Sequence, residues 1–286
     1  MTIDQNILDF LSELASADGY NPISDAKVPS LEDATGHVVI AEDDVIRAVG
    51  SIASHNDEED VRVALETAVE RSMRFPAFEK AVVEATTSLV PSNANVSVWS
   101  QRVSLDRALE ELGYEAKRSL AYMTVDLPLR NAQGLPDHVF GLRTYTDEDS
   151  AAVVSVNNDA FSDHREASGL TMGEFAATTR SSWFEDSGLI IAEDEAGVNG
   201  FCWTRVHPDG DGEIYRIAVA PSHQGVGLGR VLVMAGFAHL ADLKAVKRGT
   251  LWVDTASEGA IHLYRSIGMQ TVRTNREFER AGQPKR

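Results

Sequence analysis

The 286-residue sequence predicts a mixed α/β fold, with a mixed sheet, built from two similar units in tandem. Two pairs of matching segments occur in the same order in the two halves. Residues 37–43 resemble residues 188–194, because each is a β-branched run that ends in an acidic turn. Residues 96–114 resemble residues 250–269, because each follows the pattern strand, short helix, glycine, strand. Chance similarity is the alternative, but two pairs in one order favour a duplicated unit.

The join between the two units is predicted near residue 136. Residues 127–136 contain two prolines and a glycine among polar residues, a composition that interrupts a helix or a central strand. We therefore expect a first domain of residues 1–136 and a second of residues 137–286, each of ordinary domain size.

The composition excludes several classes of partner. The formal net charge is −18, whereas nucleic acids and anionic membranes need a basic face. The single cysteine excludes disulfides within the chain.

Residues 1–5 lack the basic start of a signal peptide, and residues 231–241 are too short to span a bilayer. No pair of histidines shows metal-ligand spacing, so His207 and His223 are expected to have surface or hydrogen-bonding roles. We expect a cytoplasmic monomer that binds no metal, nucleic acid or membrane.

A glycine-rich turn between a strand and a helix is the main chemical signal. The strand is predicted over residues 212–219 and the helix over residues 231–243, with Gly225, Gly227 and Gly229 between them. Glycines let consecutive N–H groups point inward, and a helix N-terminus adds partial positive charge, so this arrangement suits a phosphate. The spacing is that of neither a P-loop nor a dinucleotide fingerprint. An ordinary helix start is the alternative.

The corresponding stretch of the first half, residues 71–79, contains no glycine. Pro76 removes a main-chain donor there, and bulky neighbours hinder the approach of a phosphate. Leu109 stands where the second half has Tyr264. The first half is therefore expected to be a degenerate copy that has lost catalysis and tight cofactor binding, and to keep a structural or substrate-contacting role.

The segment Gln224-x-x-Gly227-x-Gly229, between a strand and a helix, resembles the pyrophosphate loop of the GNAT acetyltransferase superfamily. Residues 251–269, with Tyr264 on their helix, are similar to the last part of that fold. The resemblance implies acetyl-CoA as cosubstrate, bound in a splay between two parallel strands with its thioester carbonyl facing the Val219 amide. The cosubstrate contacts that it implies are Ile217, Ala218, Val219, Gln224, Gly225, Val226, Gly227, Leu228, Gly229, Arg230, Ser257, Glu258, Gly259, Ala260, Ile261 and His262.

Further segments resemble the mycothiol synthase family, whose members carry two GNAT halves with an active second half. The most discriminating are Asn-Asn-Asp-Ala-Phe at 157–161 and Trp-Thr-Arg-Val-His-Pro at 203–208. The resemblance implies N-acetylation of the cysteinyl amine of Cys-GlcN-Ins (desacetylmycothiol) by acetyl-CoA, giving mycothiol and CoA. The substrate contacts that it implies are Asp25, Glu166, Arg205, Glu213 and Trp252.

Three of these substrate positions depart from the family pattern. Asp25 stands where Glu is usual and Arg205 where Lys is usual, so both keep their charge. Trp252 stands where Tyr is usual, and it loses a hydroxyl while keeping a ring that can stack on a sugar.

Two residues are predicted to be catalytic. An amine must be neutral to attack, and with a pKa near 8 it needs only a modest base. Glu213, at the start of the strand before the turn, is the expected base, and a solvated strand-edge glutamate is the alternative. Tyr264 is expected to protonate the leaving thiolate, and packing under the sheet is its alternative role. Amides near Val219 would stabilise the oxyanion.

Direct transfer is predicted, because Cys202 lies in an apolar strand and is expected to be a core residue. Two other functions stay open at this point. One is a tandem GNAT enzyme for another amine, such as a peptide N-terminus or an aminosugar. The other is a non-catalytic acyl-CoA sensor.

Overall fold

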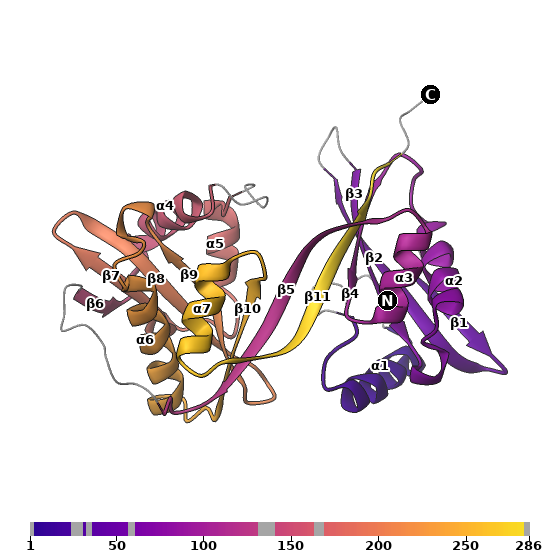
Figure 1. Ribbon diagram of the computed structural model, residues 1–286, viewed down its shortest axis with the longest axis horizontal. Coiled ribbons are helices and arrows are strands. Elements are labelled where there is room, and N and C mark those ends of the chain that lie inside the picture. Colours follow the sequence, from indigo (N-terminus) through magenta and orange to yellow (C-terminus); the bar gives the residue numbers. More distant parts are fainter. Residues whose placement is uncertain are drawn as a thin grey trace. The chain divides into compact units, whose positions relative to one another are not determined.

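The computed structural model describes residues 3–23, 31–32, 36–56, 61–130, 141–162 and 169–282 (Figure 1). Contacts divide the chain into two compact units. The first comprises residues up to Leu120 together with those from Thr274 onward, and the second is Ala121–Arg273. The predicted boundary between residues 136 and 137 lies outside the described residues.

The first unit is a mixed sheet with helices packed on it. Strands β1, β2 and β3 are antiparallel neighbours, and β3 runs parallel to β4. Its elements are α1 (Gln5–Asp18), β1 (His37–Glu42), β2 (Val45–Asn56), β3 (Val61–Val69), the short 3-10 helix η2 (Arg71–Met73), α2 (Pro76–Thr87), β4 (Asn95–Ser100), α3 (Val103–Glu111) and the start of β5 (Glu115–Asp126).

The second unit repeats this arrangement. Strands β7, β8 and β9 are antiparallel neighbours, and β9 runs parallel to β10. Its elements are β6 (Gly141–Thr144), η3 (Asp147–Asp149), α4 (Ser150–Ala160), α5 (Met172–Thr179), η4 (Asp186–Gly188), β7 (Leu189–Asp194), β8 (Gly197–Val206), β9 (Gly212–Val219), η5 (Pro221–His223), α6 (Leu228–Asp242), β10 (Arg248–Asp254), α7 (Glu258–Ser266) and the start of β11 (Gln270–Arg280).

Two helix ends confirm the predicted repeat at the level of single hydrogen bonds. Gly113 and Gly268 follow α3 and α7 with φ of 79° and 97°, the left-handed conformation that ends helices. Tyr114 N–H then donates to the Leu109 carbonyl at 2.9 Å, and Met269 N–H donates to the Tyr264 carbonyl at 3.1 Å. Leu109 therefore does occupy the position of Tyr264.

Each unit also contains a strand segment from the other half of the sequence. The end of β11 pairs antiparallel with β4 in the first unit, from Arg276↔Ser100 to Arg280↔Val96. The end of β5 is the neighbour of β10 in the second unit. Sequence reasoning missed this exchange, because the pairing of distant segments leaves no local pattern.

Two apolar clusters cover the two faces of the second sheet. One joins α6 and α7, including Tyr264 of α7, to Ile214 of β9 and Leu251 of β10. The other joins α4 and α5 to Phe201 and Trp203 of β8. In Figure 1, α6 and α7 lie together on the same side of this unit. Residues of β8–β10 therefore point alternately into one cluster or the other, except at the register shift of β9 opposite Trp203 and Thr204.

Candidate active site

The turn between β9 and α6 presents unpaired main-chain donors. Gly225 and Gly227 have φ of 76° and 91°, which glycine adopts without steric cost. Helix α6 begins at Leu228, three residues before the predicted start, and no side chain caps it. Among the described residues, no N–H from Gly225 to Arg230 donates to another main-chain group. Such N–H groups at a helix N-terminus suit a phosphate or pyrophosphate.

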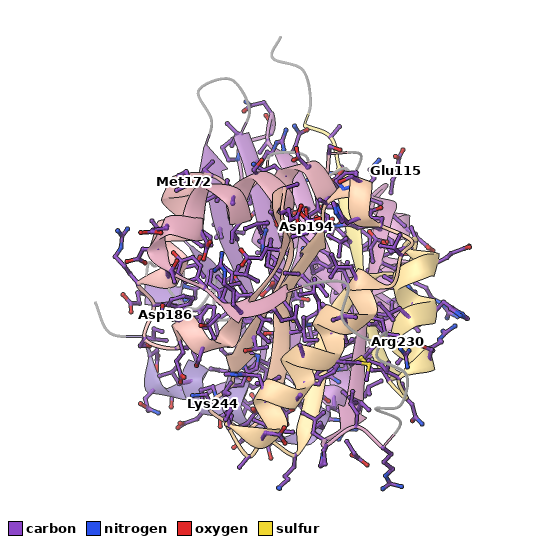
Figure 2. All side chains as sticks on the ribbon, turned by 90° about the vertical axis from the view of Figure 1, so that its left-hand side faces the viewer. Glu115, Met172, Asp186, Asp194, Arg230 and Lys244 are labelled. Atoms are coloured by element: carbon purple, nitrogen blue, oxygen red, sulfur yellow. The ribbon has the colours of Figure 1, made fainter. Side chains whose placement is uncertain are left out.

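Side chains hold this turn in place. Gln224 Nε2 donates to the Val219 carbonyl at 3.1 Å, and His223 Nε2 lies 3.1 Å from Asp194 Oδ2. Arg230 Nη1 donates to Ser266 Oγ, at the end of α7, at 2.8 Å. Figure 2 labels Asp194 and Arg230, which anchor the turn to β7 and α7. The turn is thus fixed without a ligand, which lowers the entropic cost of binding one.

The parallel strands β9 and β10 are paired over a short stretch only. Their register joins Gly212 to Gly249 and Glu213 to Thr250. Beyond this second pair, β9 continues to Val219 and β10 to Asp254. The strands therefore separate toward the end at which the glycine turn begins, as the predicted splay requires.

The edge of β9 carries main-chain groups that face this splay. Ala220 N–H donates to the Asn199 carbonyl at 2.8 Å, at the end of the antiparallel ladder with β8. Hydrogen-bonded and non-hydrogen-bonded pairs alternate along such a ladder, so Val219 and Ile217 both belong to non-hydrogen-bonded pairs. Their N–H and C=O groups point away from β8. The Val219 N–H is therefore available where the thioester carbonyl was predicted to lie.

One face of the β8–β10 sheet brings together three of the predicted substrate residues. Glu213 is paired with Arg205 on β8 and with Thr250 on β10, and paired residues share a face. Trp252 lies two residues beyond Thr250, on the same face. Glu213, Arg205 and Trp252 therefore lie on one face, with Glu213 directly beside Arg205, whereas Asp25 and Glu166 lie outside the described residues.

Aromatic rings fix the two larger of these side chains. The Arg205 guanidinium carbon lies 4.9 Å from the centroid of the Trp183 ring. The ring centroids of Trp252 and Tyr122 are 4.8 Å apart, and the Arg273 guanidinium lies 5.3 Å from the first and 4.1 Å from the second. Stacked guanidinium and ring groups lose little mobility on binding a further ring or sugar.

Glu213 has a histidine partner. His207 Nε2 lies 2.8 Å from Glu213 Oε2, which confirms a hydrogen-bonding role for His207. The Glu213 side chain is 13% exposed and that of His207 is 29% exposed. The hydrogen bond to Glu213 raises the pKa of His207, against desolvation and the nearby Arg205 charge.

Tyr264 and Cys202 lie in the apolar cluster on the opposite face, under α6 and α7. Burial raises the pKa of Tyr264 to about 12, so its phenol stays protonated at neutral pH. Burial likewise raises the pKa of Cys202 to about 12, and its side chain has no exposed surface. Cys202 is therefore a core residue, as predicted, and its thiol is unsuited to act as a nucleophile.

The remaining predicted cosubstrate residues surround the N-terminus of α7. Ser257 precedes this helix, and its N–H donates to the Asp254 carbonyl at 2.9 Å. Glu258, Gly259 and His262 are exposed, and the space around Gly259 is open. The roles predicted for the residues around the start of α7 stay predictions.

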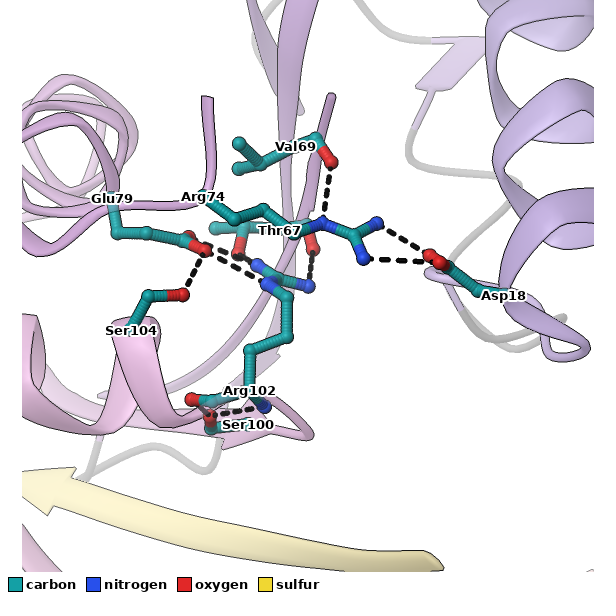
Figure 3. A network of polar contacts seen from close by, with 8 residues as sticks. All are labelled: Asp18, Thr67, Val69, Arg74, Glu79, Ser100, Arg102 and Ser104. Atoms are coloured by element: carbon teal, nitrogen blue, oxygen red, sulfur yellow. Dashed lines mark hydrogen bonds and ion pairs between the residues drawn. The ribbon is translucent and has the colours of Figure 1, made fainter. Parts of the chain in front are cut away.

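In the first unit, Arg102 contacts Thr67, and the position of Thr67 corresponds to a strand residue that faces the splay in the second unit. Arg74 Nε donates to the Val69 carbonyl at 3.0 Å, as Gln224 does to Val219, so these strand ends correspond. Thr67 then corresponds to Ile217. Its carbonyl and hydroxyl accept from Arg102 Nη1 and Nη2 at 3.3 and 2.9 Å (Figure 3).

The same arginine is paired with a buried carboxylate. Arg102 Nε and Nη2 donate to the two oxygens of Glu79 at 2.8 and 3.0 Å, and Ser104 Oγ donates to Glu79 Oε1 at 3.1 Å (Figure 3). The Glu79 side chain has no exposed surface and that of Arg102 is 9% exposed. Phe75 alone separates Arg74 from α2, where the second unit has three turn residues. The first unit therefore lacks the glycine turn, and the ion pair of Arg102 and Glu79 lies beside Thr67, the residue that corresponds to Ile217.

Sequence reasoning also missed a set of hydrogen bonds between β9 and α4. Arg216 Nη1 donates to Asn157 Oδ1 at 3.0 Å, and the buried Asn157 donates to Asn158. Asn158 in turn bonds both main-chain groups of Leu170. This explains the paired asparagines of the 157–161 segment as structural residues that fix α4 against β9.

Two negative findings concern the described ranges alone. They contain no group of three His, Cys, Asp or Glu side chains placed to hold a metal ion. Nor do these ranges include a helix long and apolar enough to cross a membrane.

Comparison with known proteins gives consistent results. Residues 154–269 match the model of the acetyltransferase (GNAT) family. The chain is 31% identical to the mycothiol acetyltransferase of Mycolicibacterium gilvum and 32% identical to that of Rhodococcus jostii, over 95% of this chain and 92% of each relative. It is 42% identical to the Thermomonospora curvata mycothiol acetyltransferase over 135 residues, 47% of this chain and 45% of that relative.

Solved structures share the fold. A GCN5-related N-acetyltransferase from Sphaerobacter thermophilus has a TM-score of 0.75 and 21% identity, over 98% of this chain and 92% of that one. A tandem GNAT protein of the clavulanic acid biosynthesis pathway has a TM-score of 0.71 and 14% identity, over 99% and 95%. The predicted tandem GNAT fold is confirmed. The chain belongs to the mycothiol acetyltransferase family and is a GNAT acetyltransferase.

Proposed function

We propose that this chain transfers the acetyl group of acetyl-CoA directly to the cysteinyl amine of Cys-GlcN-Ins, giving mycothiol and CoA. Glu213 carries the proposal: it lies at the point where β9 and β10 separate, beside Arg205 and on the same face as Trp252. The same strand leads to the outward N–H of Val219 and then to the glycine turn. The names of the relatives support the choice of amine.

The proposed reaction uses side chains from both faces of the sheet. Glu213 takes a proton from the substrate ammonium, directly or through one water, and leaves a neutral amine. As the C–N bond forms, the Val219 N–H stabilises negative charge on the thioester oxygen. When the C–S bond breaks, Tyr264 gives its proton to the sulfur, and the second proton that the nitrogen loses restores the phenol, directly or through water. The main-chain donors of 225–230 hold the pyrophosphate throughout.

We further propose that acetyl-CoA binds in the second unit alone. In the first unit, a ligand in the corresponding place would have to displace Arg102 from Thr67 and from the buried Glu79. Removing one member of a buried ion pair costs about 3–5 kcal/mol. Pro76 also lacks an N–H at the start of α2.

Release of CoA by the purified protein tests the main proposal. With acetyl-CoA and Cys-GlcN-Ins we expect turnover, and with a panel of peptides and aminosugars much lower kcat/KM. Glu213→Gln should lower kcat by about 10²-fold or more, with the affinity for acetyl-CoA unchanged. If the protein prefers another amine, that amine replaces Cys-GlcN-Ins as the proposed substrate. Binding of acetyl-CoA without turnover on any amine would contradict the enzymatic role.

A further inference from the structure

His207 is held in a defined position beside the proposed base. It follows β8 directly, and its N–H donates to the Asp211 carbonyl at 2.8 Å while its carbonyl accepts from Gly210 at 2.9 Å. These bonds close the turn between β8 and β9. The turn places the His207 ring next to Glu213 on the following strand, with Nε2 and Oε2 2.8 Å apart.

The contact occupies one oxygen of the carboxylate. Glu213 Oε2 accepts from His207, whereas Oε1 makes no hydrogen bond to any residue in the described ranges. A carboxylate with one oxygen fixed is limited in its rotation, because the fixed bond restrains its terminal torsion. Among the described residues the second oxygen has no hydrogen-bond partner, so it is open to a group of the substrate.

Charged groups face His207 from each neighbouring element. Glu213 approaches from β9, Arg205 from β8 and Asp209 from the turn. Asp211, also in the turn, is paired with Arg248 of β10, with Nε and Oδ2 2.7 Å apart. Glu213 and Asp209 favour the protonated ring, whereas Arg205 disfavours it.

We propose that His207 is a positioning residue for the acetyl transfer, one that orients Glu213 and sets its basicity through its own protonation state. This inference rests on the proposed function. A neutral ring that donates Nε2–H to Oε2 leaves the carboxylate free to take the amine proton at Oε1. A protonated ring neutralises the carboxylate charge and makes it a weaker base. The rate should therefore rise with pH as His207 loses its proton.

Two substitutions separate orientation from titration. His207→Gln keeps an N–H donor that does not titrate, and His207→Leu keeps neither property. We expect His207→Leu to lower kcat by about 10-fold or more, a part of what a general base contributes, with the KM for acetyl-CoA unchanged. His207→Gln should keep kcat within about 3-fold of the native value and lose one ionisation from the acid limb of the pH profile. Deprotonation of the substrate amine remains in every variant and serves as the internal reference.

A measurement without turnover keeps this inference separate from the function. NMR titration of the histidine rings should give His207 a pKa above its ordinary value, and Glu213→Gln should lower that pKa. If the native protein acetylates the amine but His207→Leu keeps its kcat and pH profile, the positioning role is wrong. If the native protein acetylates nothing while the NMR coupling persists, the proposed function has failed and the pair is structural.

Discussion

Tyr264 and Cys202 share one apolar core, and burial acts on both in the same direction. Each has a pKa of about 12, so each keeps its proton through the physiological range. For a thiol this means loss of nucleophilicity, because the thiolate is the reactive form. For a phenol that donates a proton to a leaving thiolate, it means that the phenol is still protonated, and so able to donate, at neutral pH. The same physical effect therefore disqualifies one residue and suits the other.

Tyr264→Phe tests the acid. It keeps the buried ring and removes the proton donor, so we expect kcat to fall by about 10²-fold, with the free energy of unfolding changed by about 1 kcal/mol or less. Because the phenol pKa is about 12, the native pH profile should show no falling limb from Tyr264 up to pH 10, roughly two units below that pKa. Steady-state rates across this pH range, with urea unfolding as the control, check both statements. Full activity of the variant would remove Tyr264 from the mechanism.

Cys202→Ala tests direct transfer. The side chain is fully buried in the cluster under α6, so its loss should cost about 1–2 kcal/mol of stability through the cavity left behind. Turnover should be unchanged, and quenched reactions should contain no acetylated protein. An acetyl group trapped on Cys202 of the native protein would contradict direct transfer.

At the scale of elements, the turn between β9 and α6 can be tested with a matched pair of glycines. Gly225 and Gly113 have φ of 76° and 79°, and neither has an atom within 4 Å of an added Cβ. Alanine at either position should therefore cost a similar amount of stability, about 1 kcal/mol. Gly225→Ala should in addition raise the Kd for acetyl-CoA, because it disturbs the donors of the turn, whereas Gly113→Ala should leave that Kd unchanged. Calorimetric titration measures the difference, and equal Kd values would contradict the assigned role of the turn.

The first unit makes a different prediction. With Arg102 and Glu79 in the corresponding place, acetyl-CoA should bind at one site per chain. Gly229→Glu adds a negative charge to the phosphate turn of the second unit and should abolish all binding. Native mass spectrometry or calorimetry gives the stoichiometry, and circular dichroism shows whether the variant is folded. Two sites in the native chain, or one residual site in the folded variant, would show that the first unit binds the cosubstrate.

Elements with a local signature were predictable from the sequence. The alternation of polar and apolar residues predicts the strand β9 at residues 212–219, which the structure confirms. The glycines after α3 and α7 end their helices as expected. The start of α6 was placed three residues late, because Gly229 has a low helix propensity and hides the first turn. The pairing of Arg102 with Thr67 joins positions 35 residues apart and leaves no pattern in the sequence. The exchange of β5 and β11 was missed for the same reason.

At the scale of the whole molecule, the net charge of −18 constrains how a polyanion such as CoA can be held. Long-range attraction is not available, so binding must rest on short-range donors. The described contacts fit this requirement. The turn offers main-chain N–H groups, and the hydrogen bond to Ser266 holds the positive charge of Arg230 next to them. An ammonium substrate meets no such obstacle. The acidic excess and the carboxylate of Glu213 both favour its approach.

We propose as the central function of this chain that it makes mycothiol from Cys-GlcN-Ins. Thiol profiling of cells that lack the protein tests this claim most directly, because it measures substrate and product in one extract. We expect Cys-GlcN-Ins to accumulate and mycothiol to disappear, with recovery on expression of the native chain and none with Glu213→Gln. Unchanged mycothiol and no accumulated Cys-GlcN-Ins in the deletion strain would contradict the claim.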